Sequence, residues 1–125
     1  MDKDQVLQIA NKAYPKIREY FGVKKKQFPS LEAHKSIYAR LSGEEDMEGE
    51  DDPIAEHDPK ENKIFFYYPV VKTKEDVIRS LIHEYAHYLQ STSWMKRYYK
   101  MGYKYQDHPY ELAAIKAEEN WWKFV

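Results

Sequence analysis

The chain contains no cysteine, only four glycines and no long apolar run. The absence of cysteine excludes disulfides, thiolate metal ligands and a cysteine nucleophile, and it fits a reducing compartment. No segment has the apolar length of a signal peptide or of a transmembrane helix. We therefore expect a cytoplasmic protein that makes no use of a membrane.

The composition that remains is typical of a soluble globular domain. The 125 residues are 42% hydrophobic, 33% charged and 16% aromatic, with 12 tyrosines. A chain of this length supports one modest hydrophobic core, and no internal repeat divides it. We expect a single domain over residues 1–125 that acts as a monomer.

The net charge of -1 hides an uneven distribution. Residues 44–52 hold seven acids and no base, which leaves 14 acids against 20 lysines and arginines in the rest of the chain. Such a run is most often a solvated loop. The other interpretations are a nucleic-acid mimic, a flap that covers a cleft, and a calcium site, for which the ligand order of an EF-hand is missing.

Hydrophobic periodicity and turn residues predict an α+β fold. The expected elements are a helix over 2–20, a strand over 33–42, a hairpin over 53–69, and two helices that begin near Thr73 and at Pro109. Thr73 and Asp76 match a capping box, and His108 can cap the last helix. We expect a short, mostly antiparallel sheet packed against the helix after Thr73. The N-terminal helix should lie behind it, and the last helix should close the site.

Two further expectations concern the C-terminal third of the chain. Residues 92–108 are predicted to form a long loop. The last helix is predicted to turn one apolar face to the core, formed by Leu112, Ile115, Trp122 and Val125.

The segment SLIHEYAHYLQ, residues 80–90, places His83, Glu84 and His87 in the order H-E-x-x-H. Residues i and i+4 of a helix lie about 40° apart, so both imidazoles point the same way and can bind one zinc ion. Glu84 lies about 100° round the helix from His83, where a carboxylate can take a proton from a bound water. Burying these groups is costly unless they are paired or bind metal. The alternative is two hydrogen-bonded core histidines beside a surface glutamate.

A catalytic zinc site needs a third protein ligand, and several candidates follow the motif. Glu111 opens the last helix, and Glu118 lies two turns later on the same face. Asp107 and His108 come just before that helix. A third histidine in the metzincin style is disfavoured, because Gln90 stands where those enzymes have a glycine. A glutamate is favoured, although Glu111 could instead complete a capping box.

The segments IRSLIHEYAHYLQ and HPYELAA together resemble the small zincins of the gluzincin type. AEHDPKENKIFFY resembles the edge hairpin of that family. The resemblance implies a zinc metallopeptidase with one zinc ion per chain, bound by His83, His87 and Glu111. The family often has a second acid two residues after the third ligand, where this chain has Ala113.

The resemblance implies hydrolysis of a peptide bond, and we expect an endopeptidase because an edge strand can pair with an extended substrate. Zinc should lower the pKa of its bound water towards about 7. Glu84 should take the proton and pass it to the leaving amine. The oxyanion needs a further donor. Tyr103, Tyr105, His108 and Tyr110 lie in the stretch that could provide it, or they are packing residues.

Other functions remain open at this point. Residues 94–105 interleave four basic with five aromatic residues, a pattern that can bind single-stranded nucleic acid. A net charge of -1 is not typical of a dedicated nucleic-acid binder, and the same segment could form a substrate-binding wall or cap the core. A site closed by four protein ligands would make the zinc structural. A chain that takes no zinc would be a binding module.

Overall fold

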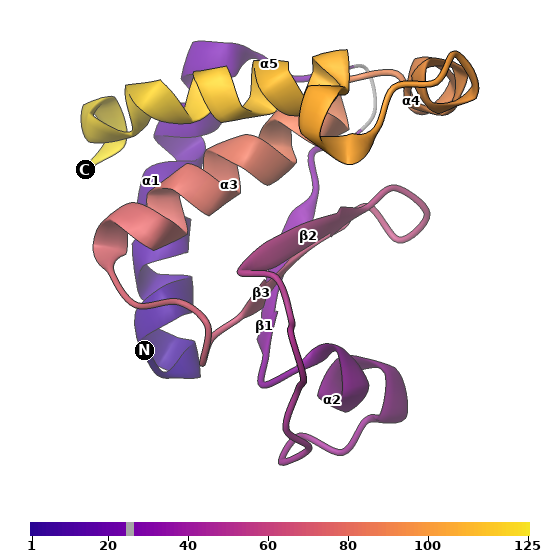
Figure 1. The fold of residues 1–125 in the computed structure, drawn as a ribbon. Helices are drawn as coiled ribbons and strands as arrows, with labels where there is room; N and C mark the ends of the chain where they lie inside the picture. The colour runs from indigo at the N-terminus through magenta and orange to yellow at the C-terminus, as the bar shows by residue number, and fades with distance from the viewer. Residues whose placement is uncertain (25–26) are drawn as a thin grey trace.

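The computed structural model describes residues 1–24 and 27–125 and has the predicted α+β class. The helices are α1 (Lys3–Phe21), α2 (Ile37–Ser42), α3 (Lys74–Leu89), α4 (Thr92–Lys100) and α5 (Pro109–Ala117). The strands are β1 (Ser30–His34), β2 (Ala55–Asp58) and β3 (Lys63–Tyr67), and the 3-10 segments are η1 (Tyr105–Asp107) and η2 (Glu118–Phe124). Figure 1 shows α1, α3 and α5 gathered on one side of the sheet, with α2 at its opposite end.

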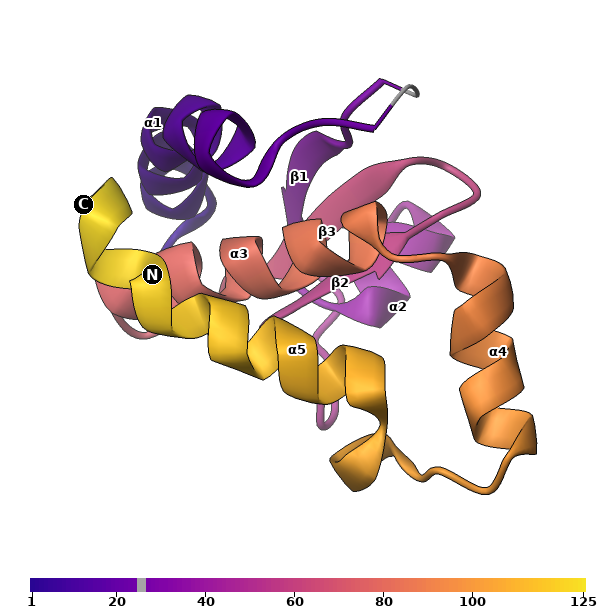
Figure 2. The ribbon, with the colours of Figure 1, turned by 90° about the horizontal axis from the view of Figure 1, so that it is seen from above.

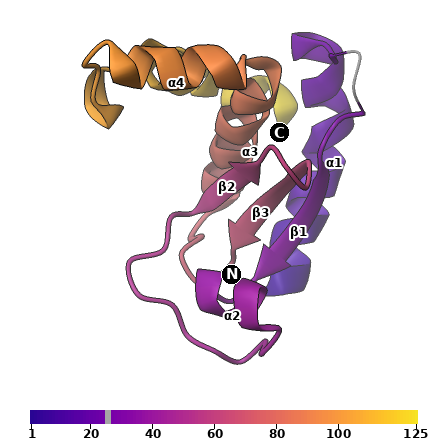
Figure 3. The same ribbon diagram turned by 90° about the vertical axis from the view of Figure 1, so that its right-hand side faces the viewer.

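The three strands form a mixed sheet in the order β1-β3-β2. β2 and β3 form the predicted antiparallel hairpin, whereas β1 runs parallel to β3. The expectation of a mostly antiparallel sheet is therefore wrong for one of the two strand pairs. Between β1 and β2 the chain passes through α2 and the acidic stretch, a connection long enough to return β3 beside β1 in the parallel direction. β2 lies at the edge of the sheet (Figure 3).

The strand predicted over 33–42 is wrong because a helix cap divides it. β1 ends at His34, and the Ser36 hydroxyl accepts a hydrogen bond from the Ala39 backbone N–H at 2.9 Å, which starts α2. Gly43 ends α2 in the left-handed conformation at φ 78°. The apparent alternation of apolar residues belongs to a short helix that buries Ala39 and leaves Leu41 71% exposed.

Helix α3 forms the centre of the fold. The predicted capping box is present: Thr73 Oγ1 accepts from the Asp76 backbone N–H, and an Asp76 carboxylate oxygen accepts from the Thr73 N–H, each at 3.1 Å. Its apolar side packs on α1 and on the sheet. The residues of α3 buried there are Val77, Ile78, Leu81, Ile82 and Tyr85. The motif helix is therefore fixed by core packing on the side away from His83 and His87.

The predicted loop over 92–108 is wrong because its first half is the helix α4. The Ser91 hydroxyl accepts from the Trp94 backbone N–H at 3.3 Å and caps the helix. α4 buries none of its residues, although Trp94, Met95 and Tyr98 recur at helical spacing in its sequence. Figure 2 shows α4 projecting from the body of the molecule.

The predicted core face of the last helix is also wrong. The four residues assigned to it are more than half exposed: Leu112, Ile115, Trp122 and Val125. Helix α5 instead turns Glu111 and Ala114 inward, which are 6% and 0% exposed. The predicted cap and start of the helix are correct, since the His108 ring accepts from the Tyr110 N–H and Pro109 is the first helical residue. The inner face of α5 carries the carboxylate of Glu111, and an analysis of hydrophobic periodicity assigns such a residue to the outer face.

The acidic stretch lies with α2, at the end of the sheet away from α4 (Figure 1). The Ser36 hydroxyl donates to the Met47 carbonyl at 2.5 Å, and residues 44–51 are exposed. This position does not support a flap over the cleft beside α3. Among the described residues, no helix is long and apolar enough to cross a membrane.

The inward and outward faces of the helices can be tested with a pair of substitutions. Ile78→Ala should lower the free energy of unfolding by about 2 to 5 kcal/mol, because Ile78 is fully buried. Ile115→Ala should change it by less than about 0.5 kcal/mol, because Ile115 lies on the outer face of α5. Urea denaturation followed by circular dichroism measures both. Equal losses in the two variants would show that α5 turns Ile115 inward.

Candidate metal centre

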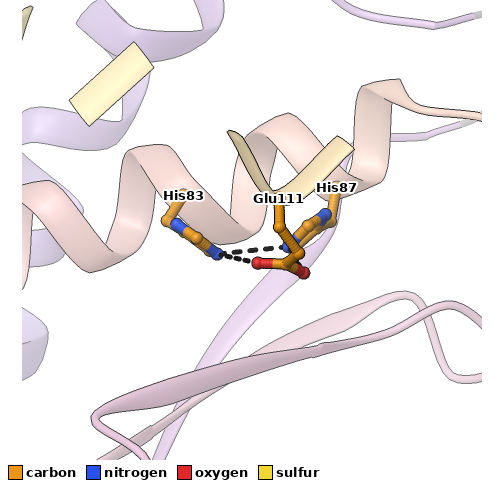
Figure 4. A group of neighbouring side chains, drawn as sticks. All are labelled: His83, His87 and Glu111. Carbon is orange, nitrogen blue, oxygen red and sulfur yellow. Dashed lines mark hydrogen bonds and ion pairs between the residues drawn. The ribbon is translucent and has the colours of Figure 1, made fainter. Parts of the chain in front are cut away.

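His83 and His87 from α3 meet Glu111 from α5 at one point (Figure 4). His83 Nε2 lies 3.1 Å from Glu111 Oε2, and His87 Nε2 lies 2.9 Å from Glu111 Oε1. The two histidine Nε2 atoms lie 3.2 Å apart. One ligand atom from each residue falls within 4.8 Å of the others. Among the described residues, this is the group that could hold a metal ion.

Each imidazole is held from behind by a second hydrogen bond. His83 Nδ1 lies 2.7 Å from Glu118 Oε2, and His87 Nδ1 lies 2.8 Å from Gln90 Oε1. Gln90 is itself fixed, because its amide N–H donates to the Tyr110 carbonyl at 3.0 Å. Carboxylate and amide oxygens only accept, so both Nδ1 atoms carry the proton. Such outer partners set the tautomer and the orientation of metal-binding histidines.

This hydrogen-bonding pattern leaves both Nε2 atoms facing each other and the carboxylate of Glu111. Two neutral imidazoles in that tautomer would direct two lone pairs at each other, 3.2 Å apart and beside an anion. A cation must therefore occupy the space, either as a proton on the rings or as a metal ion. Two imidazole nitrogens and one carboxylate oxygen form the His₂Glu donor set of catalytic zinc sites. The residues thus fit a divalent metal such as zinc.

The acid-base properties of the metal-free group follow from these contacts. Burial alone would lower the pKa of His83, but the hydrogen bonds to Glu111 and Glu118 outweigh it and raise the pKa to about 10. Burial likewise opposes the shift of His87, and the bond to Glu111 raises its pKa. Burial would raise the pKa of Glu111, but the two histidines hold it well below its usual range. At neutral pH the group is a carboxylate beside protonated imidazole.

Glu84 lies beside the group and does not bind within it. Its side chain is 8% exposed, and its carboxylate accepts a hydrogen bond from the backbone of His57 on β2. Burial raises the pKa of Glu84 to about 7, although the nearby His83 and His87 pull it down. A carboxyl group with a pKa near 7 can take up and release a proton under physiological conditions. This is the position that the H-E-x-x-H spacing predicts for a base.

Of the four residues considered as oxyanion donors, the structure brings only Tyr105 to this group. Its hydroxyl donates to Glu111, and it lines a cavity of about 300 Å³ with His83 and Glu84. Partial burial and the carboxylate of Glu111 raise the pKa of Tyr105 to about 12, so it stays protonated and can donate. The other three, Tyr103, His108 and Tyr110, pack around Tyr98 of α4.

The other candidates for the third ligand, which are Asp107, His108 and Glu118, form contacts outside the triad. His108 is fully buried and lies 3.1 Å from the Met95 carbonyl through its Nε2 atom, which joins α4 to the start of α5. Asp107 accepts from the Lys104 backbone N–H at 2.6 Å. Glu118 contacts the outer nitrogen of His83, on the side away from the triad. Glu111 is therefore the carboxylate that meets both histidines.

Cavities lie on both sides of the triad along β2. The 300 Å³ cavity of Tyr105 lies next to Ala55 at the start of the strand. A second cavity of about 340 Å³ lies towards α4 and is lined by His57, His87 and Glu111. The edge strand and α3 thus enclose a cleft with the triad between its two halves.

Gln90 and His57 were not predicted as members of this site. Glu118 was predicted only as a possible third ligand, and it lies on the outer nitrogen of His83 instead. Gln90 lies three residues after His87, so helical spacing alone could have indicated it as an outer partner. His57 had no such signal, because its position depends on how β2 packs against α3. Burial and the neighbouring His87 lower the pKa of His57 to about 4, so it is neutral at pH 7.

The metal-free protein should lose stability as the pH rises above neutrality. The pKa of His83 is about 10 in the folded chain and 6.5 as the ordinary value, so its stabilising proton is bound below pH 6.5 and lost as the pH approaches 10. Thermal unfolding in excess EDTA should show Tm falling between pH 6.5 and 10. His83→Ala should flatten this decline, and an equal decline in the variant would contradict the proposed pairing.

Glu118 should act on metal affinity through His83. Glu118→Ala should weaken zinc binding by roughly 10- to 100-fold, because the outer acceptor of a ligand histidine is lost. Competition with a chromophoric chelator measures the affinity. Glu119→Ala is the matched control, since Glu119 is the exposed neighbour, and it should bind zinc as the wild type does. Similar losses in both variants would mean that Glu118 has no specific role.

Comparisons with known proteins add no family to this description. No family model, curated protein or solved structure matches the chain. The function therefore has to be inferred from the arrangement of the side chains themselves.

Proposed function

We propose that the protein is a zinc-dependent peptidase, most simply an endopeptidase similar to the small gluzincins. The observation that carries the proposal is the convergence of His83, His87 and Glu111, with Glu84 buried beside them and outside the donor set. A structural metal site has no need of that glutamate, whereas hydrolysis requires a base next to the ligands. The metal identity, the reaction and the family resemblance are all parts of this proposal.

The chain's own residues supply three functions around the bound metal. His83, His87 and Glu111 would hold zinc, which acts as a Lewis acid and lowers the pKa of water towards about 7. Glu84 takes a proton from the attacking water and delivers it to the leaving amine, for which its pKa of about 7 is suited. The Tyr105 hydroxyl, next to Glu84 and Glu111, donates to the oxygen that becomes negatively charged.

The edge strand β2 provides a place for an extended peptide. β2 pairs with β3 on one side only within the described chain, and α3 packs across it on the side of the triad. Edge strands bind peptides by adding a strand to the sheet, with main-chain hydrogen bonds for affinity and pockets for specificity. A peptide added to β2 would run through the cleft past Glu84. This arrangement allows cleavage within a chain, so we infer an endopeptidase.

A non-catalytic zinc protein is the second candidate function. A closed structural site uses four protein ligands, and the described residues supply three to the triad. The nucleic-acid interpretation of residues 94–105 stays a prediction. Tyr98, Tyr99 and Tyr103 contact one another or His108, so part of the aromatic set already serves to hold α4 in place.

Zinc content and casein cleavage, measured on the wild type and three variants, test the proposal. The wild type should bind one zinc per chain and cleave casein. Glu84→Gln should retain zinc and lose activity by about 10²- to 10⁴-fold, because it removes the base and keeps the shape. Glu111→Ala and His83→Ala should lose zinc and activity together, because each removes a ligand.

The outcomes separate the candidate functions. Zinc retained in Glu84→Gln with unchanged cleavage would exclude Glu84 as the base. Zinc bound by a wild type that cleaves neither casein nor a peptide library would favour the structural role. A wild type that cannot be loaded with zinc would exclude both.

A further inference from the structure

We propose that the half of the cleft towards α4 is a specificity site for an acidic side chain, located before the scissile bond of the substrate. This inference rests on the proposed peptidase function and adds the class of substrate to it. It follows from the charges that line the cleft, from an unpaired histidine nitrogen and from the direction of β2.

The cavity towards α4 has walls that suit a side chain with an apolar stem. Its volume is about 340 Å³, and Pro59, Met95 and Tyr99 contribute apolar surface. His87 and Glu111 form the end that adjoins the triad. A substrate side chain in this cavity would therefore lie within a few residues of the bond that Glu84 faces.

A buried histidine nitrogen lies in the residue that lines the wall of this cavity. His57 Nε2 is buried and has no hydrogen-bond partner among the described residues. The His57 ring lies against Tyr88, with its centroid 6.3 Å away, and it lines the wall of the cavity. A buried polar atom without a partner costs free energy, so a ligand group that bonds it gains affinity. With the proton of the neutral ring on Nε2, a carboxylate oxygen of a ligand would supply the missing acceptor.

The charges around this half of the cleft favour an anion. Lys96 lines the 340 Å³ cavity, and Lys24 and Lys60 line an adjoining cavity of about 660 Å³. Among the described lining residues of both cavities, the one carboxylate is Glu111, which belongs to the triad. An excess of one sign of charge in a cleft concentrates ligands of the opposite sign.

The other half of the cleft, next to Tyr105, is lined by more acidic than basic residues. The cavity next to Tyr105 is lined by Asp76 and Glu118 besides Glu84, against Arg79 and the triad residue His83. An acidic side chain is therefore attracted to one side of the triad and repelled from the other. The cleft distinguishes the two ends of a bound peptide by charge.

The direction of β2 decides which end of the substrate meets the lysines. β2 runs from Ala55, at the cavity of Tyr105, to Asp58, at the cavities of Lys60 and Lys96. Antiparallel pairing is slightly more stable per residue than parallel pairing. A peptide antiparallel to β2 has its N-terminal half beside Asp58. The acidic side chain thus precedes the scissile bond.

The test uses the zinc-loaded Glu84→Gln protein and two fluorescein-labelled decapeptides. Both have the same Ala, Val and Thr sequence, and their N-terminal half carries either two glutamates or two lysines. Fluorescence anisotropy should show about fivefold tighter binding of the glutamate peptide, the most that an exposed ion pair usually contributes. Lys96→Glu, in the same background, should abolish or reverse the preference. Lys100→Glu is the matched control, since it reverses a charge of α4 that lines neither cavity.

The peptides that the wild type cuts show on which side of the cleaved bond the acidic residue is preferred. Proteomic peptides cut by the wild type should be enriched in Glu or Asp within the three residues before the cleaved bond, and Lys96→Glu should remove that enrichment. Enrichment after the cleaved bond, equal binding of the two peptides, or an equal effect of Lys100→Glu would overturn the inference. A wild type that binds the glutamate peptide selectively but cuts nothing would contradict the peptidase and leave the acidic site supported. Cleavage by the wild type without any charge preference would contradict the acidic site and support the peptidase.

Discussion

The carboxylate of Glu111 between the two imidazoles is the contact on which the site depends. It reaches His83 at 3.1 Å and His87 at 2.9 Å with different oxygens, and it is 6% exposed. A buried carboxylate is costly unless it is paired, so this contact requires a positive charge on the histidine side. The same contact joins α5 to α3, and it determines which face of α5 turns inward.

The fold holds the triad side chains in position because one side of α3 is packed in the core and the other side is left open. Ile78, Leu81 and Tyr85 are fully buried against α1 and the sheet, and the Tyr85 hydroxyl donates to the Gly22 carbonyl at 2.5 Å. The histidines lie on the opposite side, under α5 and facing β2. Sites built on well-packed helices hold their geometry better than sites on loops. The cleft is thus bordered by elements whose positions are fixed by the core.

The sequence predicts the parts of this structure that depend on local spacing. The H-E-x-x-H pattern, the cap at Thr73 and the start of α5 at Pro109 all follow from positions within one helix. The parallel pairing of β1 could not be predicted in this way, since it depends on a long connection. Helix α4 was missed even though Trp94, Met95 and Tyr98 recur at helical spacing. The face of α5 that turns inward was predicted wrongly because of one charged residue. Its inner face carries Glu111, which an analysis of hydrophobicity assigns to solvent.

The three triad side chains are paired with one another, so a metal ion that binds there would replace the proton shared among them. In the metal-free chain a proton on His83 satisfies Glu111, and the bonds from Glu118 and Gln90 hold both rings in the orientation that a metal requires. Metal binding at this group would therefore release protons, and the outer hydrogen bonds would already hold both rings in place. The 17 buried residues of the apolar core do not include the triad, so the packing that positions α3 is separate from the candidate metal site. A metal group that lies outside the apolar core and has the buried Glu84 beside it fits the catalytic proposal better than a structural role.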